Sequence, residues 1–215
     1  MKFTADKVYL PENGLKENIV ITCDDNGVII DLTEKSKIDS TVKKYKGTII
    51  PGFVNAHCHL ELSHMRNVIP TGTGLITFIK EVVSRRDEIE ADKFAELEKF
   101  DEIMYDAGIQ AVGDISNFTD TFQQKEKSNI YYHTFIEAFD FLNDDQAEKI
   151  FNGAHENFKK LNTSNNGNKS IVPHAPYTCS PSLYKLIREF QSNTRQILSI
   201  HNQETPQENI FLKKG

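Results

Sequence analysis

The sequence has few cysteines and no apolar run long enough to cross a membrane. Its 215 residues include three cysteines, Cys23, Cys58 and Cys179, scattered along the chain and odd in number. This usage is typical of a reducing compartment and argues against a disulfide scaffold. The first residues, MKFTADKVYLPENG, lack the apolar stretch of a signal peptide. We therefore expect a cytoplasmic protein that makes no contact with a membrane.

Basic residues are neither abundant nor clustered. The formal net charge is −6, and Lys and Arg are spread along the chain, so nucleic acid is not an expected partner. With 38% hydrophobic and 26% charged residues, the composition is ordinary for a globular protein. The length suffices for one sizeable domain, with or without a small appendage.

Glycine-rich phosphate loops are also missing. Neither GxGxxG nor GxxxxGK[ST] follows any predicted strand, and TGTG at 71–74 is interpreted as a flexible loop. Their absence removes support for a doubly wound open sheet, which is the main alternative for a chain that alternates strands and helices.

The pattern of apolar residues changes near residue 50. Residues 1–49 alternate short β-type runs with polar turns, which predicts a small β-sandwich-like segment. Residues 50–215 alternate strand and helix patterns, which predicts α/β structure built from parallel βα units. A complete (β/α)8 barrel needs about 250 residues, so we predict a partial TIM-type barrel of about five βα units. Its first strand is predicted to run through TIIPGFVNAH and its fifth through QILSIHNQE.

Two expectations follow for packing. A helix that begins at Leu75 carries an apolar stripe that we interpret as core packing, formed by Leu75, Phe78, Ile79, Val82 and Val83. A five-strand arc would also have two open edges and an inner face of Val, Ile, Phe and His in water. We therefore expect the polypeptide to aggregate, to form a homo-oligomer, or to be the ordered part of a longer chain.

The segment GFVNAHCHLELSH contains two histidines separated by one residue, His57 and His59, which follow an apolar run. Residues i and i+2 of a strand point to the same face. Two neutral imidazoles aimed at one point suit a divalent metal ion, although a pair that only makes hydrogen bonds is an alternative interpretation. Glu61, two residues further on, lies on the same side of the chain.

Further reactive residues occur where later strands are predicted to end. In a barrel, the residues that carry the chemistry gather at the C-terminal ends of the strands. These ends add Asp114, Glu137, His174, His201 and Glu204. Asp114 is predicted to be structural, and Glu137 is a weak candidate.

The segments PGFVNAHCHLE, GIQAVGDIS, VPHAPYTCSPS and SIHNQETPQE together resemble the amidohydrolase superfamily. The similarity is to its mononuclear branch of chlorohydrolase-like enzymes and nucleoside or nucleobase deaminases, and it runs from about residue 47 to the end. Each motif is weak alone, but the combination is specific. The resemblance implies a barrel of which this chain looks like the N-terminal part.

The resemblance also implies roles for five residues, and a sixth, Glu61, is interpreted from its position beside them. His57, His59 and His201 match three metal ligands, and Glu204 matches the carboxylate that moves protons. His174 matches a histidine that contacts the substrate. Glu61 has two open interpretations, substrate binding or orientation of a metal-bound histidine. A bridging lysine is missing from VPHAPY, so one divalent ion is implied, with zinc as the first choice and iron or manganese as alternatives.

The implied reaction is hydrolytic deamination of a small nucleoside-like molecule or another cyclic amidine by a metal-activated water. The alternatives are hydrolytic removal of another leaving group, as in chlorohydrolases, and an inactive truncated barrel that serves as a binding module. The family's remaining metal ligand is an Asp after the eighth strand, which this chain does not contain. We therefore expect the polypeptide alone to lack deaminase turnover.

Overall fold

The computed structural model describes residues 1–87, 92–163, 167–192 and 196–214. The chain divides into two compact units, Met1–Gly52 and Phe53–Gly215. Each unit is described by itself. Among the described residues, none of the helices combines the length and the apolar character needed to cross a bilayer.

The first unit contains one five-stranded sheet. Its strands are β1 (Lys2–Leu10), β2 (Gly14–Lys16), β3 (Ile19–Cys23), β4 (Ile29–Glu34) and β5 (Lys43–Ile49). β1 pairs with β2 and β3 in the antiparallel sense and with β5 in the parallel sense, and β3 pairs antiparallel with β4. Its core is formed by Val8, Ile19, Ile21 and Cys23. The sandwich-like packing expected for this segment stays a prediction.

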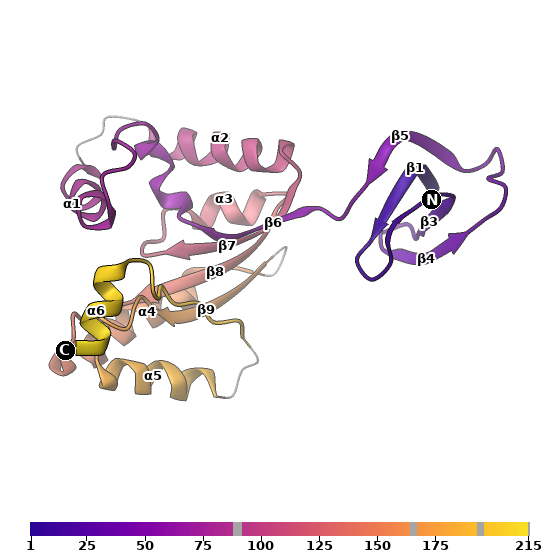
Figure 1. Cartoon of the computed structure of the whole chain (residues 1–215). Helices are drawn as coiled ribbons and strands as arrows, with labels where there is room; N and C mark the ends of the chain where they lie inside the picture. The colour runs from indigo at the N-terminus through magenta and orange to yellow at the C-terminus, as the bar shows by residue number, and fades with distance from the viewer. Residues whose placement is uncertain (88–91, 164–166, 193–195, 215) are drawn as a thin grey trace. The chain divides into compact units, whose positions relative to one another are not determined.

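The second unit is built on a four-stranded parallel sheet in the order β6-β7-β8-β9 (Figure 1). Its strands are β6 (Phe53–Cys58), β7 (Ile109–Ser116), β8 (Tyr131–Ala138) and β9 (Gly167–Pro173). Helices alternate with these strands, so the α/β class predicted from the sequence is confirmed. Because the strands are parallel and adjacent, their C-terminal ends meet at one edge of the sheet.

Some helices of this unit begin at a residue whose side chain caps the backbone. The helices of the unit are η1 (Leu60–Met65), α1 (Leu75–Arg85), α2 (Lys93–Asp106), α3 (Phe122–Lys127), η2 (Asp144–Gln146), α4 (Ala147–Lys160), α5 (Pro181–Gln191) and α6 (Pro206–Lys214). The side chain of Asp92 accepts backbone N–H bonds at the start of α2, and Ser180 does the same for α5. Pro181 follows as the first residue of α5, where a missing N–H costs nothing.

Alternation along the strands separates two faces of the sheet. On β8, Tyr132 and Ile136 belong to clusters packed against the helices, whereas Phe135 joins Ile115 and Val172 in a cluster on the opposite face. By the same alternation, Glu137 projects to the Phe135 face. Ile115, Phe135 and Val172 are buried, whereas Phe53 of β6 and Ile197 and Ile200 of the last segment are exposed. The apolar surface expected to be exposed is therefore buried in the middle of the sheet and exposed at its edges.

Two predicted strands differ from the structure. The strand predicted through TIIPGFVNAH is interrupted: β5 ends at Ile49 and belongs to the first unit, and β6 begins only at Phe53. Pro51, which cannot donate to a ladder, and Gly52 fill the gap.

The fifth predicted strand is not formed, since residues 197–204 are described without strand structure. This segment still follows β9, because the His201 N–H donates to the His174 carbonyl oxygen at 2.8 Å. At the other end, the Ser170 hydroxyl donates to the Ile197 carbonyl oxygen at 2.8 Å. A side chain therefore supplies a bond that a backbone N–H would supply in a continuous ladder.

Candidate metal and substrate site

Three histidines predicted as metal ligands converge at the C-terminal edge of the parallel sheet. His57 lies on β6, His59 follows it, and His201 lies in the segment after α5. One ligand nitrogen from each lies within 4.8 Å of the others. The ring centroids of His57 and His201 are 4.8 Å apart. Imidazole nitrogens are favoured ligands of divalent ions, so the three residues form a candidate metal site.

The environment keeps two of these imidazoles neutral. Burial lowers the pKa of His57, and the neighbouring His201 lowers it further. Burial lowers the pKa of His59 to about 4. A neutral imidazole carries the lone pair that a metal ion needs, so both side chains are chemically suited to the role of ligand at neutral pH.

His201 has two oxygen atoms close to one side of its ring. Its Nδ1 lies 3.2 Å from the carbonyl oxygen of His174 and 3.2 Å from Oε1 of Glu137. Because a carbonyl oxygen can only accept, Nδ1 carries the hydrogen and Nε2 is left with the lone pair. Contact with Glu137 raises the pKa of His201, although burial opposes this shift. The same pattern orients ligand histidines in known metal sites.

His174 and Glu204 border the same cavity as the three histidines. Nδ1 of His174 lies 2.8 Å from the Thr178 hydroxyl, and burial lowers the pKa of His174. Glu204 is exposed, and its backbone N–H donates to the Glu208 carboxylate at 2.8 Å. Glu208 also accepts the N–H of Gln203, which has a positive φ of 60°. Buried Glu208 thus anchors the turn that presents Glu204.

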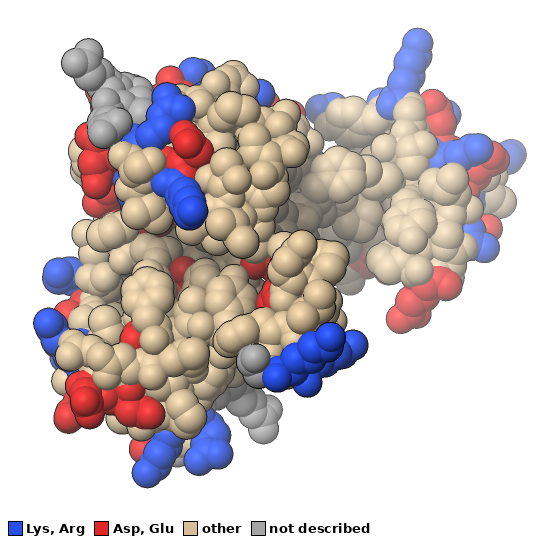
Figure 2. Space-filling model, turned by 60° about the vertical axis from the view of Figure 1, so that its left-hand side comes forward, with Lys and Arg blue, Asp and Glu red and all other residues tan. Residues whose placement is uncertain are grey.

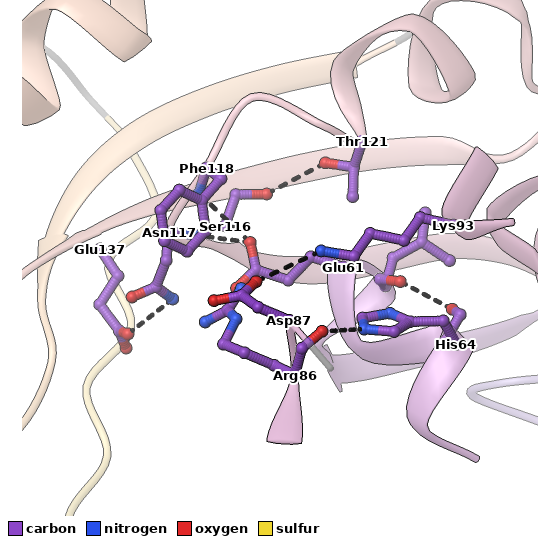
Figure 3. A network of polar contacts seen from close by, with 12 residues as sticks. Glu61, His64, Arg86, Asp87, Lys93, Ser116, Asn117, Phe118, Thr121 and Glu137 are labelled. Atoms are coloured by element: carbon purple, nitrogen blue, oxygen red, sulfur yellow. Dashed lines mark hydrogen bonds and ion pairs between the residues drawn. The ribbon is translucent and has the colours of Figure 1, made fainter. Parts of the chain in front are cut away.

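Glu61 is engaged with the loop that follows β7 (Figure 3). Its Oε2 accepts the backbone N–H groups of Asn117 and Phe118 at 3.0 and 3.2 Å, and its Oε1 lies 3.7 Å from Arg86. Burial raises the pKa of Glu61 to about 7. Glu61 therefore lines the cavity, but both of its oxygens already have protein partners.

A buried ion pair fixes the chain just beyond His59. Asp114 accepts the backbone N–H of Leu60 at 2.8 Å, and Nζ of Lys125 lies 2.5 Å from its other oxygen. Both side chains are almost completely buried. Asp114 is thus a structural residue, as its position at a strand end predicts, and it ties the end of β7 to the turn after the HxH pair.

The apolar stripe of α1 does not form core. None of the residues of α1 is buried, and the stripe lines the cavity that holds the histidines. The prediction of core packing for Leu75, Phe78, Ile79, Val82 and Val83 is therefore wrong. An amphipathic pattern shows that one helix face is apolar, but it does not show what covers that face.

The cavity has a volume of about 510 Å³ and combines one apolar wall with a polar floor. Figure 2 shows this unit hollowed on the side turned to the viewer, with acidic atoms visible within the hollow. The polar part brings together every site residue predicted from the sequence: His57, His59, Glu61, His174, His201 and Glu204. A volume of this size suits a small-molecule ligand.

Five further residues border the cavity without having been singled out for it: Leu62, Arg86, Asn117, Phe139 and Tyr177. Glu137, ranked low from its sequence position, is another lining residue. The sequence could have indicated this, because Glu137 ends a strand and lies two residues after Phe135, on the same face. The sequence offered no comparable signal for Asn117 or Tyr177, which lie in loops.

Several proteins are similar to this chain. The 5'-deoxyadenosine deaminase of Methanococcus vannielii is 26% identical over 215 residues, which covers 94% of this chain and 50% of that protein. The crystal structure of Helicobacter pylori aminofutalosine deaminase in complex with methylthio-coformycin superposes with a TM-score of 0.82 at 17% identity and covers 100% of this chain and 54% of that one.

Atrazine chlorohydrolase TrzN from Arthrobacter aurescens, complexed with zinc, superposes with a TM-score of 0.71 at 16% identity, over 97% of this chain and 54% of that one. These structural similarities are evidence of a shared fold. The chain spans about half the length of the curated relatives it matches.

The second unit thus places a cluster of histidines at the C-terminal edge of a parallel α/β sheet, beside a cavity of small-molecule size. The amidohydrolase family profile matches residues 48–215. The chain belongs to the amidohydrolase family, and the family predicted from the sequence motifs is confirmed.

Proposed function

We propose that this chain carries the metal and substrate site of a hydrolase that deaminates a nucleoside-like molecule or a related cyclic amidine. The observation that carries the proposal is the convergence of His57, His59 and His201 within 4.8 Å, in one cavity with Glu204 and His174. Relatives named as deaminases of 5'-deoxyadenosine support this class of substrate. The reaction is the hydrolysis of a carbon–nitrogen bond with release of ammonia.

The three histidines would hold one divalent ion, with zinc as the first choice and iron or manganese as alternatives. When bound, such an ion lowers the pKa of a coordinated water from about 15.7 toward about 7. Two of the histidines have lowered pKa values and so carry free lone pairs at neutral pH.

Glu204 would accept a proton from the attacking water and return it to the leaving nitrogen. Its exposure at the cavity border leaves it accessible for this role, and the Glu208 anchor holds its backbone. His174, whose ring centroid lies 4.9 Å from that of His201, would hydrogen-bond the substrate beside the metal ligands. Glu61 would keep the loop at 117–118 in place, since its oxygens already have partners.

We also propose that the parallel sheet of the second unit is an arc of a (β/α)8 barrel, preceded by a small β-sandwich-like segment at residues 1–49. The parallel order β6-β7-β8-β9 and the buried inner cluster of Ile115, Phe135 and Val172 support an arc whose concave side is filled by side chains.

Removal of a different leaving group is the second candidate function. The similarity in fold to atrazine chlorohydrolase TrzN favours it, because both reactions attack a ring carbon with an activated water. An inactive binding module is the third possibility that the sequence raises.

Zinc-dependent binding of 5'-deoxyadenosine, measured by equilibrium dialysis beside an ammonia-release assay, tests the proposal. We expect binding that requires zinc and is lost in His57→Ala, with little or no turnover, because only three protein ligands are identified for the ion among the described residues. Binding that ignores both zinc and His57→Ala would contradict the proposed site. Atrazine in the same assays, with chloride release as the readout, tests the second candidate.

A further inference from the structure

The carboxylate of Glu137 has one oxygen that the protein leaves without a hydrogen-bond partner. Glu137 is only 8% exposed. Its Oε2 accepts from Nδ2 of Asn117 at 3.1 Å. Its Oε1 is buried and has no hydrogen-bond partner among the described residues. The nearby Nδ1 of His201, at 3.2 Å, makes an ionic contact outside hydrogen-bond geometry.

A buried acceptor without a donor is costly, on the order of 1–3 kcal/mol and more when it is charged. Native structures seldom keep one unless water, an ion or a ligand fills the vacancy. Glu137 is one of the residues that line the cavity. The ligand that enters the cavity is therefore the natural source of the missing donor.

A carboxylate oxygen accepts hydrogen bonds or binds a cation, and Oε1 of Glu137 is the oxygen left without a partner. The group that binds to Oε1 must then be an O–H, an N–H or a cation.

The position of Glu137 shows which part of a ligand it would meet. It lies on the Nδ1 side of His201, whereas the lone pair available for a metal is on Nε2. A group bound at Oε1 therefore meets the Nδ1 edge of His201 and not the Nε2 lone pair that a metal ion would use. It would belong to a part of the ligand that does not react.

The surroundings of Glu137 suit a sugar. Asn117 places a side-chain amide beside the carboxylate, and the ring of Phe139 lies 5.5 Å from that of His174. Phe139 and Tyr177 line the same cavity. A carboxylate, an amide and aromatic rings together offer acceptors for hydroxyl groups and apolar surface for the C–H faces of a sugar.

We propose that Glu137, assisted by Asn117, is the subsite that accepts hydrogen bonds from the sugar hydroxyls of a nucleoside ligand. This inference rests on the proposed function for its choice of a nucleoside. It assigns to Glu137 the hydroxyl-binding role that the sequence suggested for Glu61, whose oxygens are already engaged. The selectivity that follows is for ribonucleosides over nucleosides that lack the 2'- and 3'-hydroxyls.

The test is equilibrium dialysis of the zinc-loaded protein with adenosine and with 2',3'-dideoxyadenosine. Hydrogen bonds to a charged group contribute about 1.5–3 kcal/mol each, so we expect the wild type to prefer adenosine by roughly 10- to 100-fold. Glu137→Ala should reduce this preference to within about threefold, and Glu137→Gln, which keeps one neutral acceptor, should be intermediate. The matched control is Glu156→Gln on α4, which replaces an exposed carboxylate paired with Lys159 and should keep the full preference.

Three outcomes would overturn the inference. Equal weakening of both nucleosides by Glu137→Ala would mean that Glu137 only orients His201. Two zinc ions per chain in the wild type, falling to one in Glu137→Ala, would mean that Glu137, His174 and His201 hold a second cation. If Glu137→Ala and Glu137→Gln both keep the wild-type preference for adenosine, the sugar hydroxyls bind elsewhere.

The same experiment distinguishes failure of the proposed function from failure of the sugar subsite alone. If neither nucleoside binds the wild type in a zinc-dependent manner, the proposed function and the sugar subsite are both overturned. If both bind but the preference does not depend on Glu137, only the subsite is overturned. Circular dichroism will show whether Glu137→Ala folds. If it does not, the preference for adenosine is compared between Glu137→Gln and Glu156→Gln, and an equal preference in these two variants overturns the subsite.

Discussion

The backbone N–H of His201 donates a hydrogen bond of 2.8 Å to the carbonyl oxygen of His174. This bond ties a candidate metal ligand to a candidate substrate contact, although the two residues come from different segments of the chain. A second bond, from the Ser170 hydroxyl to the Ile197 carbonyl oxygen, secures the beginning of the same segment. The position of His201 thus depends on two contacts with β9 and its end.

Ser170→Ala should loosen the segment that carries His201. Loss of a buried hydroxyl bond costs about 1–3 kcal/mol of unfolding free energy, and zinc affinity should fall by up to roughly tenfold because His201 is less well oriented. Chemical denaturation and a chelator competition measure the two effects. Ser192→Ala, which removes an exposed hydroxyl bond on α5, is the control and should change neither.

Lys125→Met should be strongly destabilising. It leaves Asp114 charged and fully buried without its partner, at a cost of about 3–5 kcal/mol. Lys127→Met on the same helix breaks an exposed pair with Glu98 and should cost less than about 1 kcal/mol. Similar denaturation midpoints for the two variants would show that the pair does not anchor the turn after His59.

Phe78→Ala should affect ligand binding more than folding. Phe78 is 44% exposed on the cavity wall, so its removal should cost less than about 1 kcal/mol of unfolding free energy. Leu183→Ala, at a fully buried position of α5, should cost about 2–5 kcal/mol. If Phe78→Ala destabilises the protein as much as Leu183→Ala, α1 is packed as core after all.

Lowering the pH should reduce the free energy of unfolding through protonation of His133. Its side chain is 5% exposed, its Nε2 lies 3.0 Å from the Ser170 hydroxyl, and burial lowers its pKa below the ordinary 6.5. The unfolded chain therefore binds a proton there before the folded chain does. The stability contributed by neutral His133 is present above pH 6.5 and is lost as the pH falls through the lowered pKa.

The measurement is the unfolding free energy of the wild type and of His133→Gln between about pH 7.5 and about pH 5. The wild type should lose up to about 1 kcal/mol per pH unit more than the variant in the acid part of this range. Parallel curves for the two proteins would show that His133 does not contribute to the acid sensitivity.

The α/β class and the histidine cluster could be predicted because both depend on local patterns. Alternating strand and helix periodicities indicate parallel βα units, and parallel strands bring their ends together whatever the details of packing. The end of β6 places His57 and His59 together, and His201 joins them although the strand predicted for it is not formed. Family motifs added the roles that geometry alone could not assign.

The features that the sequence did not predict depend on contacts between residues far apart in the chain. The segment QILSIHNQE has the alternation of a strand, but only its contacts with β9 reveal that Ser170 replaces a backbone donor. The stripe of α1 is apolar whether it faces a core or a cavity. Glu137 and Glu61 are both carboxylates near strand ends, and only their hydrogen bonds show that Glu61 is occupied while an oxygen of Glu137 is not.

Zinc binding by the histidine cluster is the central claim, and elemental analysis of protein prepared without chelator tests it most directly. The comparison is between the wild type and a His57→Ala/His59→Ala double variant, with circular dichroism to verify that both are folded. We predict that the wild type retains zinc and that the double variant retains at least about tenfold less, because two of three neutral nitrogen ligands are gone. Equal zinc content in the two proteins would contradict the assignment of the site.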